Sequence, residues 1–169
     1  MKKLLVVIDM QNDFVFGALG SKEAQSILPA VKETIEEFKK AGQTVVFTRD
    51  THENDYLSTQ EGKYLPVPHC IRGEKGWEIV DGLRENERVF NKPTFGSLAL
   101  AEYIKAENFD EVTLIGVCTD ICVASNALLI KATCPELPLR LIKNCCAGVT
   151  PQTHEAAIAT LASCQVQIL

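Results

Sequence analysis

The segment GVCTDICV, at positions 116–123, contains two cysteines separated by three residues. A cysteine attacks as its thiolate, and the ordinary thiol pKa of about 8.5 leaves little thiolate at neutral pH unless the surroundings help. The pair could also be a redox couple, half of a metal site or part of a buried turn. A thioredoxin-like couple requires C-x-x-C, so the C-x-x-x-C spacing argues against it. The same spacing disfavours a zinc site at this pair without excluding one.

Other reactive side chains also end apolar runs of the sequence. Asp9 ends LLVVID, Asp50 ends TVVFTRD and Lys92 ends RVFNK, while Cys118 and Cys122 follow VTLIGV. Each has an ordinary explanation when taken alone, since aspartates often form caps and turns, lysines are usually solvated and cysteines are often buried and inert. A parallel sheet would make a shared function more plausible than these separate explanations. Such a sheet brings the carboxyl ends of its strands to one edge, where a single ligand can contact all of these side chains.

Short β-branched runs alternate with amphipathic stretches along the whole chain. The runs occupy 4–9, 44–50, 88–92, 112–117, 139–144 and 166–169. Continuous apolar runs of this length are typical of strands buried on both faces. Between them lie helix patterns, for which Ser97 and Thr150 are the predicted N-caps. The alternation predicts a three-layer α/β/α fold with a mainly parallel, Rossmann-like sheet of about six strands, in a single domain that spans 1–169.

Composition narrows the class of partner. The 169 residues are 46% hydrophobic and 23% charged with a net charge of −5, and they contain no basic run, so nucleic acid is not an expected partner. The first apolar run is too short to span a membrane, and no secretory cleavage site follows it. Seven cysteines, an odd number without the spacing of a disulfide framework, favour a reducing compartment. We therefore expect a cytoplasmic protein with a small-molecule partner.

Cys122 is the better candidate nucleophile of the two cysteines. A helix pattern follows the strand pattern, with Thr119 or Asp120 as the predicted N-cap and Cys122 in the first turn, where the helix dipole favours a thiolate. Cys118 precedes the cap, so its side chain gains less from the helix. Because no histidine lies near these cysteines in the sequence, a carboxylate is the expected base.

Asp9 and Lys92 complete a candidate triad with Cys122. A carboxylate that faces a lysine is held ionised by the positive charge, so Asp9 can act as the base and Lys92 as the cation that stabilises negative charge.

A second constellation lies on and after the run 44–50. Asp50, His52 and His69 form a D-x-H…H set of oxygen and nitrogen donors, and catalytic metal sites typically have three protein ligands and open positions. The alternative is that Asp50 caps a turn and both histidines lie on the surface. The segment 51–81, which contains the histidines, is long and polar, and a loop of that length usually serves a function.

The sequence resembles the isochorismatase-like cysteine hydrolases and, within them, the nicotinamidases (pyrazinamidases). The resemblance covers nearly the whole chain and rests on four ordered segments: IDMQNDF at 8–14, TRDTH at 48–52 with PHC at 68–70, NKPTFGS at 91–97 and GVCTDICV at 116–123. It implies that nicotinamide, or a close heteroaromatic carboxamide, is hydrolysed to the acid and ammonia through a thioester, as in NAD salvage. The implied roles are general base for Asp9, cation for Lys92 and nucleophile for Cys122.

The resemblance also implies the remainder of the site. A cis peptide is expected before Cys118, and the N–H groups of Cys118 and Cys122 would form the oxyanion hole. Asp50, His52 and His69 would bind a divalent metal, with zinc favoured over manganese or iron, and Glu61 lies where some nicotinamidases supply a fourth ligand. Phe14, Leu19 and Trp77 match positions that wall the substrate ring, and Phe95 stands where the family often has tyrosine. A further departure is Ile121, in place of a polar or aromatic residue. Such proteins frequently form homo-oligomers.

Three other functional hypotheses compete with a nicotinamidase-like hydrolase. An aspartate-based phosphotransferase usually shows D-x-D after the first strand, but Gln11 occupies the second position. A dinucleotide-binding module would have G-x-G-x-x-G where DMQNDF stands. The third is a relative that acts on another small amide or only binds ligands, and an intact Asp9, Lys92 and Cys122 argues against the non-catalytic form.

Overall fold

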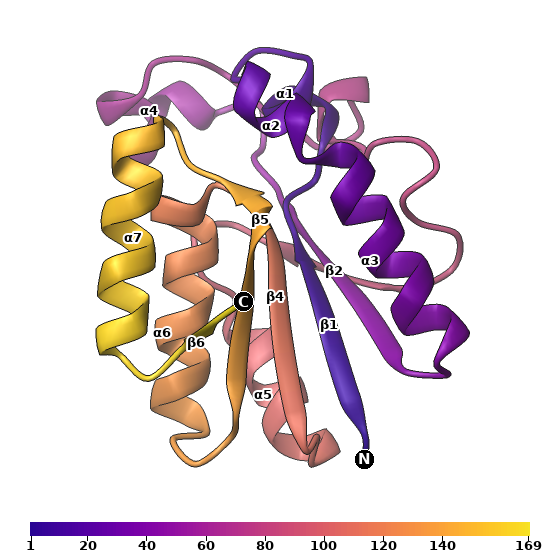
Figure 1. Cartoon of the computed structure of the whole chain (residues 1–169). Helices are drawn as coiled ribbons and strands as arrows, with labels where there is room; N and C mark the ends of the chain where they lie inside the picture. The colour runs from indigo at the N-terminus through magenta and orange to yellow at the C-terminus, as the bar shows by residue number, and fades with distance from the viewer.

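The computed structural model describes all residues, 1–169, and its strands form a single sheet (Figure 1). The strands are β1 (Lys3–Ile8), β2 (Thr44–Asp50), β3 (Arg88–Lys92), β4 (Glu111–Val117), β5 (Leu139–Ala147) and β6 (Gln167–Ile168). Their order is β3-β2-β1-β4-β5-β6, and every neighbouring pair is parallel. The predicted six-stranded parallel sheet is confirmed, although β5 continues past the expected end at residue 144 and β6 is only two residues long.

Helices cover both faces of this sheet. They are α1 (Asn12–Val15), α2 (Lys22–Ser26), α3 (Leu28–Lys40), α4 (Gln60–Tyr64), α5 (Leu98–Glu107), α6 (Ala124–Thr133) and α7 (Pro151–Ser163). Two short 3-10 turns, η1 (Tyr56–Ser58) and η2 (Lys75–Trp77), and one π-helical turn, η3 (Thr119–Val123), complete the elements. In Figure 1, α6 and α7 lie on the opposite side of the sheet from α3.

The alternation of side chains along the strands explains the three layers. On β1, Leu4, Val6 and Ile8 belong to the apolar cluster that packs against α5, α6 and α7. The intervening Leu5 and Val7 belong to the cluster that packs against α2 and α3. Successive side chains of a strand point to opposite faces, so a continuous apolar run requires cover on both sides.

Both predicted N-caps are confirmed. Ser97 Oγ accepts a hydrogen bond from the Leu100 N–H at 3.1 Å and begins α5. Thr150 begins α7 with a capping box, in which Thr150 Oγ1 accepts from the Thr153 N–H and Thr153 Oγ1 accepts from the Thr150 N–H, each at 3.1 Å. These bonds satisfy N–H groups that have no partner inside a helix.

The sheet order reverses between β1 and β4, which are neighbours at its centre. The two strands approach so closely that a Cβ on Gly116 would overlap the carbonyl oxygen of Ile8, and Gly116 has a φ of +119°. In open parallel sheets, the crevice beyond the carboxyl ends of the strands at such a switch point is the usual ligand site. Asp9 and the η3 turn lie directly after these two strands.

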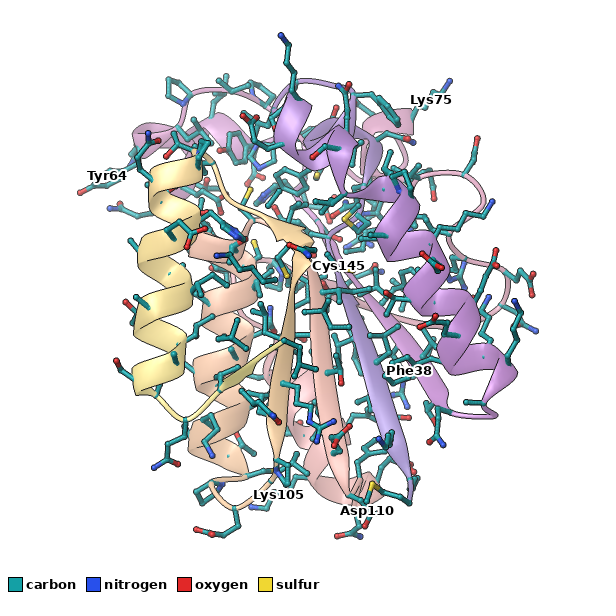
Figure 2. All side chains as sticks on the ribbon, in the orientation of Figure 1. Phe38, Tyr64, Lys75, Lys105, Asp110 and Cys145 are labelled. Carbon is teal, nitrogen blue, oxygen red and sulfur yellow. The ribbon has the colours of Figure 1, made fainter.

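The segment 51–81 was predicted as a loop, and it contains η1, α4 and η2 at the carboxyl end of the sheet. Figure 2 shows Tyr64 and Lys75 at this end of the molecule and Lys105 and Asp110 at the opposite end.

None of the helices combines the length and apolar composition that a membrane span requires.

Candidate active site

Asp9 and Lys92 form a fully buried ion pair at the switch point. Lys92 Nζ lies 2.6 Å from Asp9 Oδ2, and the two residues are 1% and 0% exposed. Asp9 leaves β1 with a φ of 49°, a conformation that aspartate tolerates better than most residues. Thr48 on the neighbouring strand β2 donates to Asp9 Oδ1 at 2.6 Å. Asp9 Oδ2 contacts Lys92 and accepts no other hydrogen bond, so it has a lone pair free for a proton.

The Lys92 ammonium connects this pair to Cys122. Its Nζ lies 3.4 Å from Cys122 Sγ, 3.2 Å from Asp50 Oδ1 and 3.1 Å from the Thr94 carbonyl oxygen. The structure therefore brings Asp9, Lys92 and Cys122 together, as the sequence predicted. The ammonium also contacts Asp50, so the triad and the predicted metal cluster share a charge network.

Burial and charge shift the pKa values of all three groups. Burial raises the pKa of Asp9, as does nearby Asp50, and Lys92 offsets part of this rise. For Lys92, burial acts to lower the pKa, but Asp9, Cys122 and Asp50 outweigh it and hold the pKa above the ordinary range. The Cys122 pKa is well above its ordinary value because of burial and Asp9, with Lys92 opposing. The raised pKa values favour a protonated Cys122 thiol and make the Asp9 carboxylate more basic than that of an ordinary aspartate.

Cys122 lies in the first helical turn after β4, as predicted, but the predicted N-cap is wrong. Neither Thr119 nor Asp120 caps a helix; Cys118 occupies the N-cap position of the π-helical turn η3, without a side-chain cap, and α6 begins only at Ala124. The predicted fall in the thiol pKa is also wrong, because burial and the nearby Asp9 raise this pKa above its ordinary value. Burial, together with Asp120 and Asp9, raises the pKa of Cys118 to about 12 as well. What distinguishes Cys122 is therefore its contact with Lys92.

The peptide bond between Val117 and Cys118 is cis, as the family resemblance implied. No backbone or side-chain acceptor in the structure takes a hydrogen bond from the Cys118 N–H. This N–H therefore has its hydrogen free for an oxyanion, and Cys118 lines the same cavity as Cys122.

The four predicted metal ligands meet in one cluster. The ligand atoms of Asp50, His52, Glu61 and His69 all lie within 4.8 Å of one another. His52 Nε2 is 3.0 Å from Asp50 Oδ2 and 3.6 Å from Glu61 Oε1, and His69 Nε2 is 3.6 and 3.8 Å from the same oxygens. Both histidines are buried, which contradicts the alternative that they are surface residues.

The surroundings of the cluster suit a divalent cation. The Val67 carbonyl accepts from His69 Nδ1 at 2.8 Å, which directs Nε2 toward the cluster, and the ring of Tyr56 packs against both imidazoles. Burial would raise the Asp50 pKa, but His52, His69 and Lys92 hold it well below the usual range. Burial and Asp50 raise the Glu61 pKa. Two nitrogens and two carboxylates around one point are a donor set that zinc, manganese or iron accepts, so the residues fit the metal.

A cavity of about 550 Å³ joins the cluster to the thiol. Asp50, Glu61 and His69 line it together with Cys118 and Cys122. Its walls are mainly apolar and include Phe14, Leu19, Leu65, Phe95, Ile121 and Val149. An apolar cavity with a few polar groups at one end is typical of a site for a small aromatic ligand.

Trp77 does not line this cavity, contrary to the prediction. Its ring stacks against the Arg49 guanidinium, 3.4 Å from the ring centroid, and its indole N–H donates to Thr51 Oγ1 at 2.9 Å. These contacts hold Trp77 against Arg49 and Thr51, the residues on either side of Asp50 in the sequence. Phe14, Leu19 and Phe95 do line the cavity, and the Phe14 ring packs edge-on against His69 with centroids 5.5 Å apart.

Sequence reasoning missed two supporting residues, Thr48 and Tyr56. Thr48 precedes Asp50 by two positions on β2, so the strand alternation places both side chains on one face and could have indicated its contact with Asp9. Tyr56 is 1% exposed and its hydroxyl donates to the Leu65 carbonyl, but nothing in its local sequence predicts burial inside a long polar segment.

The fold and site together define a three-layer α/β protein with a buried Cys-Asp-Lys constellation beside a His₂-carboxylate cluster. A family model described as the Isochorismatase domain matches residues 3–169, and the chain belongs to this family.

Individual relatives agree with this assignment. The nicotinamidase/pyrazinamidase of Mycobacterium tuberculosis is 26% identical over 99% of this chain and 98% of its own length. A protein of Arabidopsis thaliana described as a probable inactive nicotinamidase is 30% identical over 91% of this chain and 85% of its own. The crystal structure of the pyrazinamidase of Pyrococcus horikoshii in complex with zinc superimposes with a TM-score of 0.88 and 29% identity, covering 100% of this chain and 99% of that chain.

Proposed function

We propose that this chain is a cysteine amidohydrolase that converts nicotinamide, or a close heteroaromatic carboxamide, into the acid and ammonia. The observation that carries the proposal is that Cys122, which contacts Lys92 of the buried Asp9–Lys92 pair, lines a single apolar cavity together with Asp50, Glu61 and His69 of the four-ligand cluster. Relatives named nicotinamidase or pyrazinamidase, aligned over nearly the whole chain, support this substrate class.

The first half-reaction transfers the acyl group to the enzyme. Asp9 Oδ2 takes the thiol proton as Cys122 Sγ attacks the amide carbon, and Lys92 stabilises the forming thiolate from 3.4 Å. The carbonyl electron pair moves to oxygen and then returns as the carbon–nitrogen bond breaks. Asp9 gives its proton to the leaving nitrogen, so that ammonia departs and a thioester remains on Cys122.

The second half-reaction regenerates the thiol. Asp9 accepts a proton from water as the water oxygen attacks the thioester carbon, and the carbon–sulfur bond breaks. The sulfur leaves next to Lys92 and recovers the proton from Asp9. The N–H groups of Cys118 and Cys122 hold the oxyanion in both halves, and the free Cys118 N–H supports this role.

Asp50, His52, His69 and Glu61 would hold a divalent metal, with zinc as the first choice. When bound, the metal would supply a Lewis acid that positions the substrate ring through its nitrogen rather than activating water. The zinc complex of the Pyrococcus horikoshii relative supports the choice. Phe14, Leu19 and Phe95 then wall the ring. Phe95 and Ile121 line the cavity and carry no hydroxyl that could bind a polar ring substituent. The cavity therefore favours carboxamides whose ring carries no polar substituent on that side.

The test is to incubate zinc-loaded protein with nicotinamide and measure ammonia. We expect turnover by the wild type, and in Cys122→Ala a loss of kcat by at least about 10³-fold. Turnover that survives Cys122→Ala would contradict the mechanism. Turnover of other amides but not of nicotinamide, in a panel that includes pyrazinamide and benzamide, would move the assignment to another substrate.

A non-catalytic binding role is the competing function, and the Arabidopsis relative described as probably inactive favours it. Iodoacetamide labelling separates the two functions, because a Cys122 that resists alkylation at neutral pH in the presence of zinc would indicate a binding protein.

The single domain, the cytoplasmic location, the place in NAD salvage and the homo-oligomer remain predictions from the sequence. Sedimentation of the purified chain would measure its assembly state.

A further inference from the structure

Asn126, on the first turn of α6, has a buried side-chain amide in which every group is used. The residue is 1% exposed. Its Nδ2 donates to the Cys122 carbonyl at 2.8 Å and to the Phe95 carbonyl at 3.1 Å, and its Oδ1 accepts from the Ser97 N–H at 3.0 Å. The partners fix the orientation of the amide, because two carbonyls require the NH₂ group and one N–H requires the oxygen.

All three partners belong to segments that carry the candidate chemistry. The Cys122 carbonyl is on the nucleophile itself. Phe95 and Ser97 belong to the connection from β3 to α5, which follows Lys92 directly. The loop 93–96 accepts two hydrogen bonds in the structure, from Lys92 Nζ at the Thr94 carbonyl and from Asn126 at the Phe95 carbonyl. The Asn126 amide is thus one of two polar anchors of this loop.

A core-facing position on α6 would ordinarily be apolar. Its buried neighbours along the helix, Ala127 and Ile130, belong to the main apolar cluster. A buried amide is unfavourable unless its hydrogen bonds are made, so its presence here depends on the bonds it makes. Those bonds link the Cys122 main chain to the loop that follows Lys92. The Cys122 thiol and the Lys92 ammonium lie 3.4 Å apart although they are 30 positions apart in the sequence, so only tertiary contacts hold them together.

We propose that Asn126 is a positioning residue of this enzyme, which ties the η3 turn to the loop 93–96 and so keeps Cys122 Sγ within reach of Lys92. It touches neither the thiol nor the substrate cavity and acts through the Cys122 main chain. The inference rests on the proposed amidase function, and it predicts an effect on the chemical step rather than on substrate or metal binding.

Two substitutions and one control test the proposal. Asn126→Leu keeps the approximate size and removes all three bonds. Asn126→Asp keeps the shape and the acceptor for the Ser97 N–H but places carboxylate oxygens against two carbonyls. The matched control is Thr133→Val, which removes the hydrogen bond from Thr133 Oγ1 to the Leu129 carbonyl on the same helix, away from the cavity.

The measurements use zinc-loaded proteins that share the wild-type circular dichroism spectrum. In both Asn126 variants we expect kcat for nicotinamide to fall about 100-fold, as a small misplacement of a reacting group does. KM and the zinc affinity should stay within about threefold of wild type. The rate of Cys122 alkylation by iodoacetamide, followed by mass spectrometry of its peptide, should fall by at least about tenfold, because a displaced thiol loses the stabilising charge of Lys92. Thr133→Val should leave both rates unchanged.

The alkylation rate separates this inference from the proposed function, since it needs no turnover. If the wild type fails to hydrolyse nicotinamide, slower alkylation in the variants still supports the positioning role. Wild-type kcat and alkylation rates in a folded Asn126→Leu, or an equal loss in Thr133→Val, would overturn it. Should both variants fail to fold, Asn126→Ser tests the loop bonds alone, because its hydroxyl can reach the Cys122 carbonyl four residues back. Full activity in Asn126→Ser would then overturn the proposal.

Discussion

At the residue scale, the central feature is a lysine ammonium with more acceptors than hydrogens. Four acceptors lie within 3.4 Å of Lys92 Nζ, on Asp9, Asp50, Thr94 and Cys122. An ammonium has three hydrogens, so the bonds must be shared, and they can shift toward sulfur as the thiol loses its proton. A buried lysine held protonated by this surplus of acceptors is suited to stabilise charge that appears only during the reaction.

The two cysteines of GVCTDICV should differ sharply in their response to substitution. Cys122→Ala should lower kcat/KM for nicotinamide by at least about 10³-fold, because the nucleophile is removed. Cys118→Ala should keep most of the activity, because the proposed role of Cys118 uses its main-chain N–H, which alanine retains. The measurement is ammonia release by both variants. A loss in Cys118→Ala as large as that in Cys122→Ala would assign chemistry to the Cys118 thiol.

The pH dependence should report Asp9. The proposed base accepts a proton only as a carboxylate, and burial raises its pKa above the ordinary value of 3.8. The acid limb of kcat/KM should therefore fall as the pH drops through that raised pKa. The hydrogen bond from Thr48 opposes the rise, so the isosteric Thr48→Val should move the acid limb to higher pH. A shift to lower pH, or none, would exclude Asp9 as the group that titrates.

At the element scale, the close packing of β1 against β4 places the reacting residues. Ile8 pairs with Gly116 in the register of these strands, so Asp9 and the Val117–Cys122 segment leave the sheet side by side. The π-helical turn η3 follows, and α6 begins only at Ala124. Cys122 lies within this turn and is 5% exposed. Single-turn π-helices are frequent at functional sites.

Gly116→Ala should strongly destabilise the protein. The new methyl would overlap the Ile8 carbonyl, and the φ of +119° is strained for any L side chain, so we expect a loss of at least about 3 kcal/mol in the free energy of unfolding. Gly42→Ala is the matched control, because its φ is +68° but no atom lies within 4 Å of the added Cβ; its loss should be about 1 kcal/mol. Urea denaturation measures both, and equal losses would show that the close approach of β1 and β4 is unimportant.

At the scale of the whole molecule, the site combines the strand ends with the cover formed by residues 51–81. β2 and β3 bring Asp50 and Lys92, β1 and β4 bring Asp9 and Cys122, and the segment after β2 returns His69 and Glu61 over the same edge. Because the carboxylates of the cluster are partly or fully buried, a divalent cation would neutralise charge that burial otherwise penalises.

Zinc should therefore stabilise the whole fold. Added to chelator-treated protein at about 100 times its dissociation constant, zinc should increase the free energy of unfolding by about 2.7 kcal/mol, since it binds the folded state. The corresponding rise in melting temperature should disappear in the double variant His52→Ala/His69→Ala. A rise that persists in this variant would place the zinc elsewhere on the chain.

The sequence by itself determined the sheet, because continuous apolar runs demand cover on both faces and parallel strands bring Asp9, Asp50, Lys92 and Cys122 to one edge. Its ordered motifs also indicated the metal ligands and the family. Tertiary structure alone decided that Trp77 packs against Arg49 outside the cavity, that Cys122 sits in a π-helical turn and that its thiol pKa is raised rather than lowered. The same holds for the Asn126 bonds. Such features depend on burial and on contacts between residues far apart in the chain, which local patterns do not encode.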